Sequence, residues 1–85
     1  MTECRLTIGR SATKEFEALP ANVIERVRDK IRSLAMDPRP PGSKKLQGYD
    51  NAWRVRVGDY RILYEIDDGE HIVDIGAIRH RSKAY

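Results

Sequence analysis

Residues 53–64, WRVRVGDYRILY, decide the architecture of this chain. Apolar and polar residues alternate on both sides of Gly58-Asp59, which is typical of two half-buried strands. Glycine in first place suits a two-residue hairpin turn, because this position needs a positive φ. A turn of that length fixes the register, so Val57 lies opposite Tyr60 and Arg56 lies opposite Arg61. The stretch therefore predicts an antiparallel hairpin with one apolar face and one face that carries arginines.

The segments around this hairpin complete the fold. An acidic turn at residues 67–70 leads into a last strand, expected from His71 to about Ile78. At the other end of the chain, residues 4–8 alternate in the same way and predict a short strand.

Two amphipathic helices are expected between the first strand and the hairpin. Apolar residues recur at helical spacing over residues 12–19 and 21–36, on either side of Pro20. The Pro-rich stretch 37–42 ends the second helix. The order β-α-α-β-β-β predicts an α+β fold, with the N-terminal strand and a helical hairpin packed on one face of an antiparallel-rich four-stranded sheet.

Length and composition narrow the class of protein. With 85 residues, the chain is expected to form a single domain over 1–85. We expect neither a signal peptide nor a membrane span, because no apolar run approaches the ~18–20 residues that a bilayer requires. A lone cysteine, Cys4, excludes an intrachain disulfide and fits a reducing cytoplasm. We expect neither a metal nor another cofactor.

Basic residues gather in the second half of the chain. The hairpin register places Arg54, Arg56 and Arg61 on one face, although like charges directly opposite each other cost about 0.2–1 kcal/mol. Guanidinium groups grip phosphate oxygens bidentately, so a phosphate-binding face is the functional interpretation and a solvated strand face the alternative. The other candidate RNA-binding residues lie in a loop before the hairpin and after the last strand: Lys44, Lys45, His80, Arg81 and Lys83.

Arg79 is the uncertain member of this group. Strict alternation from Val73 would place Arg79 on the apolar face, away from the other arginines. Either the strand ends before Arg79, or a β-bulge at Gly76 switches the face. Tyr49 and Tyr85 fall outside the apolar pattern, so both are candidates for stacking on a base.

The second half of the chain resembles the RelE branch of the RelE/ParE toxin superfamily. The resemblance rests on the loop KLQG (45–48), on WRVR (53–56), on GDYRILY (58–64) and on the terminal run RHRSKAY (79–85). In the N-terminal half, the order of the elements matches the family better than the individual residues do.

The resemblance implies the toxin of a type II toxin–antitoxin pair that cleaves mRNA codons in the ribosomal A site without a metal. The 2′-hydroxyl would be the nucleophile. The family's catalytic positions fall on Arg54, Arg56, Arg61, Arg79 and Tyr85. Arg61 and Arg79 would stabilise charge on the phosphate, Arg54 and Arg56 would hold flanking phosphates, and Tyr85 would stack on the nucleotide. Typical members carry lysines where this chain has Arg54 and Arg56, so the general acid and base stay unassigned, with His80 and Tyr85 as candidates.

The resemblance also implies partners: a cognate RelB-like antitoxin, the ribosome with its mRNA, and a hetero-oligomeric complex that binds DNA through the antitoxin. Two alternatives stay open. One is a ParE-like inhibitor of DNA gyrase, and the other is a ribosome- or RNA-binding module without chemistry.

Overall fold

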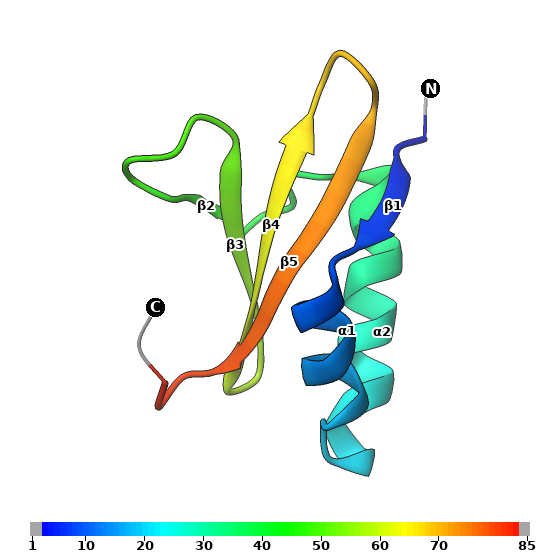
Figure 1. Cartoon of the computed structure of the whole chain (residues 1–85), viewed down its shortest axis with the longest axis vertical. Coiled ribbons are helices and arrows are strands. Elements are labelled where there is room, and N and C mark those ends of the chain that lie inside the picture. Colours follow the sequence, from blue (N-terminus) through cyan, green and yellow to red (C-terminus); the bar gives the residue numbers. More distant parts are fainter. Residues whose placement is uncertain (1–2, 84–85) are drawn as a thin grey trace.

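The computed structural model describes residues 3–83 (Figure 1). This range contains two helices and five strands. Four of the strands and both helices follow the predicted order, and β2 (Lys44–Lys45) is an additional short strand. Their bounds are β1 Arg5–Ile8, α1 Arg10–Glu17, α2 Ala21–Met36, β2 Lys44–Lys45, β3 Ala52–Val57, β4 Tyr60–Asp67 and β5 Ile72–His80.

The strands form one sheet in the order β1-β5-β4-β3-β2. β1 runs parallel to β5, and the other neighbours are antiparallel. The predicted α+β fold is confirmed, but the sheet has five strands rather than four. Placing Lys44 and Lys45 in a loop was wrong: as β2 they pair with Arg54 and Trp53. A two-residue strand has too little alternation to be recognised from sequence.

The hairpin register is as predicted. Val57 lies opposite Tyr60, and Arg56 lies opposite Arg61. Gly58 adopts a φ of 58°, which a glycine tolerates without strain. The turn chemistry of two residues thus sets which side chains share a face over the whole of β3 and β4.

The core lies between the two helices and one face of the sheet. Both helices cover this face and run in opposite directions, and no helix of the described residues covers the other face of β3, β4 and β5 (Figure 1). We call the uncovered side the open face. The buried cluster comprises Ala12, Val27, Ile31, Leu34, Val55, Val57, Ile62, Tyr64, Ile66, Val73, Ile75 and Ile78.

A β-bulge interrupts β5. Tyr64 lies opposite Ile75, whereas Leu63 lies opposite Ala77, so Gly76 is an extra residue without a partner on β4. Before the bulge Val73 and Ile75 point into the core; after it, Ile78 does. Of the two alternatives for this strand, the bulge is therefore the one observed, and β5 continues to His80 rather than ending near Ile78.

The loop that follows α2 is fixed to the sheet. The Tyr64 hydroxyl donates a 2.7 Å hydrogen bond to the Pro38 carbonyl oxygen. Burial raises the pKa of Tyr64 to about 12. Arg39 bonds the Asp68 carboxylate at 2.9 Å and lies 5.0 Å from the Trp53 ring centroid. These contacts hold the loop that leads to β2 against β3 and the end of β4. Within residues 3–83, neither helix has the length and apolar character needed to cross a membrane.

Candidate nucleic-acid interface

Three arginines lie side by side across the open face. Arg56 on β3 is directly opposite Arg61 on β4, and Arg61 is directly opposite Arg79 on β5. Residues directly opposite in antiparallel strands project to the same side of the sheet. We call Arg56, Arg61 and Arg79 the arginine row. It exists because the hairpin turn fixes the first pair and the Gly76 bulge brings Arg79 to the open face.

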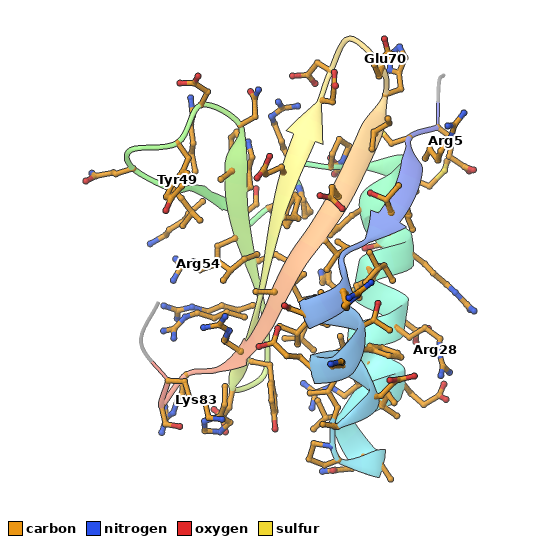
Figure 2. The ribbon with its side chains drawn as sticks, viewed as in Figure 1. Arg5, Arg28, Tyr49, Arg54, Glu70 and Lys83 are labelled. Atoms are coloured by element: carbon orange, nitrogen blue, oxygen red, sulfur yellow. The ribbon has the colours of Figure 1, made fainter. Side chains whose placement is uncertain are left out.

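Arg54 and Lys44 extend this positive surface. Arg54 is two residues along β3 from Arg56 and therefore on the same face, and Lys44 lies opposite Arg54. Arg54 lies on the side of the sheet away from the helices, as does Tyr49 (Figure 2). The structure thus brings four of the five predicted catalytic residues, together with Lys44, to the open face.

The segment after β5 is tied back to the hairpin turn. The Arg81 N–H donates to the Asp59 carbonyl oxygen at 2.7 Å, and Arg81 Nε lies 3.8 Å from Asp59 Oδ1. Arg61 Nη1 donates to the Arg81 carbonyl oxygen at 3.5 Å. Arg56, Arg61 and Arg81 share a hollow of about 120 Å³ beside the turn. Asp59 also lines this hollow and offsets part of the Arg81 charge, so Arg56 and Arg61 are the cations that suit an anion as small as a phosphate group.

Helix α2 contributes a basic side chain that the sequence pattern had not indicated. Lys30, Lys44, Arg54 and Arg56 line one hollow of about 300 Å³ where β2 ends along the edge of β3. A usable signal existed, because Arg26 and Lys30 are four residues apart and therefore share one face of the helix.

An apolar hollow adjoins the basic surface. It has a volume of about 430 Å³ and is lined in part by Leu46, Tyr49, Ala52 and Leu63. Leu63 lies opposite Arg54, so the hollow begins beside the arginines. Tyr49 is 65% exposed, which leaves its ring accessible for stacking.

Two predicted RNA-binding residues are not brought to the open face. His80 lies opposite Tyr60 and packs against it edge to face, at 5.1 Å between ring centroids. The Ser82 N–H donates to His80 Nδ1 at 3.2 Å. Lys45 lies opposite Trp53, so it projects to the helix side of the sheet. His80 and Lys45 thus lie in strands, away from the arginine row, and their role in RNA binding stays a prediction.

The remaining site residues lie near the end of β5. Lys83 is exposed beyond this strand (Figure 2). Tyr85, expected to stack on the nucleotide, lies outside the described residues. Among residues 3–83 no three His, Cys, Asp or Glu side chains are grouped in a way that could hold a metal ion.

Comparison with known proteins agrees with this architecture. A family model described as ParE toxin of type II toxin–antitoxin system, parDE, matches residues 6–85. Toxin RelE of Mycobacterium tuberculosis is 31% identical over 81 residues, which is 94% of this chain and 84% of the relative.

Two solved structures have the same fold. One is the archaeal RelE–RelB complex from Pyrococcus horikoshii, with a TM-score of 0.84, 25% identity and coverage of 98% of this chain and 100% of that one. Another is the toxin–antitoxin complex RelBE2 from Mycobacterium tuberculosis, with a TM-score of 0.84, 26% identity and coverage of 98% and 97%.

The fold, the family model and these relatives define a toxin of a type II toxin–antitoxin system. Within the RelE/ParE toxin superfamily, the chain belongs to the RelE branch.

Proposed function

We propose that this toxin is a ribosome-dependent endoribonuclease that cleaves mRNA codons in the A site. The observation that supports the proposal most is the arginine row, in which Arg56, Arg61 and Arg79 face the same side from three adjacent strands. Opposed like charges do not stabilise the fold of a small, marginally stable domain, so binding of an anionic ligand is the role that accounts for the row.

The chemistry is an attack by the 2′-hydroxyl on the adjacent phosphorus. The 2′ oxygen loses its proton and bonds to phosphorus, the bond from phosphorus to the 5′ oxygen breaks, and that oxygen takes up a proton. The products are a 2′,3′-cyclic phosphate and a 5′-hydroxyl. Arg61 and Arg79 stabilise the charge on the five-coordinate phosphate, and Arg54 and Arg56 hold flanking phosphates.

Binding extends beyond the reacting phosphate. Lys30, Lys44, Arg81 and Lys83 add charge around the row, and Tyr49 offers a face on which a neighbouring base stacks at the apolar hollow. Guanidinium groups stay protonated, so the arginines act by charge and not as bases. The ribosome then supplies the orientation that the reaction needs, which can be worth an effective molarity of ~10⁵–10⁸ M.

A RelB-like antitoxin is the partner that we propose for the complex. The support is that two of the structures with this fold are complexes of a RelE-type toxin with its antitoxin. An acidic or apolar antitoxin segment would cover the basic open face and keep RNA away from it.

The decisive experiment adds the purified toxin to programmed ribosomes and maps mRNA ends by primer extension. The expected result is cleavage within the A-site codon, little cleavage of the same RNA without ribosomes in excess EDTA, and loss of most cleavage in Arg61→Ala and Arg79→Ala. Arg32→Gln, which removes an exposed charge on α2, serves as the matched control and is expected to cleave normally. Intact mRNA on arrested ribosomes would support a non-catalytic binding module instead.

A second candidate is inhibition of DNA gyrase, which the parDE description of the matching family model favours. Gyrase-dependent DNA breakage by the toxin, together with uncut mRNA, would establish that alternative.

A further inference from the structure

Glu15 connects α1 to the part of β5 that carries Arg79. The Ile78 N–H donates a 2.9 Å hydrogen bond to Glu15 Oε1, and Arg79 Nε donates a 2.9 Å hydrogen bond to Glu15 Oε2. β1 ends at Ile8, which lies opposite Ile75, so no strand among residues 3–83 borders β5 on this side at Ile78. The carboxylate takes the place of the missing strand there and holds the next side chain at the same time.

The contact fixes Arg79 by only one of its nitrogens. The side chains of Glu15 and Arg79 are 29% and 37% exposed, so both are largely withdrawn from water. Within residues 3–83, Glu15 is the only residue that bonds the Arg79 guanidinium. The two terminal nitrogens, the pair that grips a phosphate bidentately, are therefore left for a ligand.

We propose that Glu15 is a positioning residue for Arg79. It anchors Arg79 at Nε and leaves its terminal nitrogens directed at the reacting phosphate. This inference rests on the proposed ribonuclease function. It assigns a role in the site to α1, an element for which neither charge pattern nor motif predicted one.

Two simpler roles for Glu15 predict different results. If Glu15 only fastens α1 to β5, its loss lowers stability and leaves the rate per folded molecule unchanged. If Glu15 acts only through its charge, its loss makes the open face more positive, so RNA binds more tightly and is cut at least as fast. Positioning alone predicts slower cleavage without weaker binding.

Glu15→Gln separates these roles. The amide oxygen still accepts the Ile78 N–H, while the amide nitrogen cannot accept a hydrogen bond from Arg79 Nε. We expect kcat on programmed ribosomes to fall by about 10- to 10²-fold, the scale that a misplaced catalytic group produces, with an unchanged or lower KM. Glu17→Gln, an exposed residue of the same helix, is the matched control and is expected to cleave normally. Normal cleavage by Glu15→Gln would overturn the inference.

A double-mutant cycle with Arg79→Ala tests whether Glu15 acts through Arg79. Glu15→Gln is expected to cause no further loss in the Arg79→Ala background; an equal loss in both backgrounds would overturn the inference. Should Glu15→Gln fail to fold, Glu15→Asp keeps the charge but shortens the reach. It is expected to lower kcat as well, and full activity of that variant would equally overturn the inference.

The cycle also separates this inference from the function on which it rests. If Arg79→Ala cleaves at the wild-type rate, or the wild type cuts nothing, the proposed function fails. If Arg79→Ala is inactive while Glu15→Gln matches Glu17→Gln, the proposed function stands and only the role of Glu15 is wrong.

Discussion

Arg56→Gln should make the toxin more stable and less active. Arg56 is exposed, lies directly opposite Arg61 and is two strands from Arg79. Within residues 3–83, Arg56 makes no hydrogen bond or ion pair that its replacement would remove. Its removal relieves repulsion within the arginine row and deletes the contact to a flanking phosphate that we propose for Arg56.

The gain in stability follows from the geometry of the sheet. Opposed side chains ~5 Å apart repel by ~0.8 kcal/mol in water, and a charge two strands away at ~10 Å adds ~0.4 kcal/mol. The repulsion between Arg56 and Arg79 is an upper limit, because Glu15 neutralises part of the Arg79 charge. A Debye length of ~30 Å at 0.01 M salt leaves about 1 kcal/mol of this repulsion, whereas ~3 Å at 1 M leaves about 0.2 kcal/mol.

Thermal unfolding at the two salt concentrations measures this difference. For a domain of this size we expect Arg56→Gln to raise Tm by about 4–8 °C at 0.01 M salt and by about 1–2 °C at 1 M. Cleavage on programmed ribosomes should fall by about 10- to 10²-fold, because the charged hydrogen bond that holds a flanking phosphate is lost, at a cost of ~1.5–3 kcal/mol.

Arg32→Gln is the control, because it changes the net charge equally. Arg32 is exposed on α2, and its neighbours one turn earlier, Arg28 and Asp29, have opposite charges that offset each other. An equal gain in Arg32→Gln would show that net charge rather than the row is responsible. A loss of stability in Arg56→Gln would refute the argument outright.

Three further predictions concern single side chains. Tyr49→Ala should weaken substrate binding, measured as a rise in KM of about 5- to 150-fold from lost base stacking, while Tyr49→Phe keeps wild-type values; equal KM in all three would exclude a base at the hollow. Lys30→Gln should reduce the salt dependence of single-stranded RNA binding by ~0.7 in the log–log slope, with no change in Arg32→Gln; an unaltered slope would remove Lys30 from the interface. Burial raises the pKa of Tyr64 to about 12, so between pH ~10 and 12 the hydroxyl keeps its proton in the folded protein but loses it in the unfolded one. The contribution of Tyr64 to stability is therefore complete below pH ~10 and is lost as pH rises to 12. Urea unfolding of the wild type should show a loss of about 2 kcal/mol or less over that range, and Tyr64→Phe should lack this part of the loss; identical slopes for both proteins would contradict the assignment.

Sequence determined most of the sheet because turn chemistry and alternation act locally. Gly58-Asp59 fixed the register of β3 against β4, and with it the pairing of Arg56 and Arg61. β2 was not predicted, because two residues are too few to show alternation. Its pairing also depends on the preceding loop, which contacts of Tyr64 and Arg39 hold in place.

The parts of the site that sequence did not predict depend on contacts between distant segments. Lys30 joins the basic surface because α2 packs beside the edge of β3. Glu15 meets Arg79 because β1 stops short of Ile78, a consequence of relative strand lengths. His80 was expected after the last strand, because the sequence left open whether a bulge lets β5 continue past Ile78.

The bulge at Gly76 makes the number of residues in β5 as important as their identity. Before the bulge, every second residue from Val73 points into the core. If that alternation continued without the bulge, Arg79 would point inward and Ile78 would point outward. Loss of the bulge at unchanged length would therefore exchange the two, exposing an aliphatic side chain and burying a guanidinium, even though no charged or core residue had been replaced. Deletion of Gly76, in contrast, would leave a regular ladder in which Ile78 still points inward and Arg79 still points to the open face. In this strand the bulge and the residue count therefore belong together: a relative with one residue fewer at this point would have a strand without the bulge, and its equivalents of Ile78 and Arg79 would face the same sides as here.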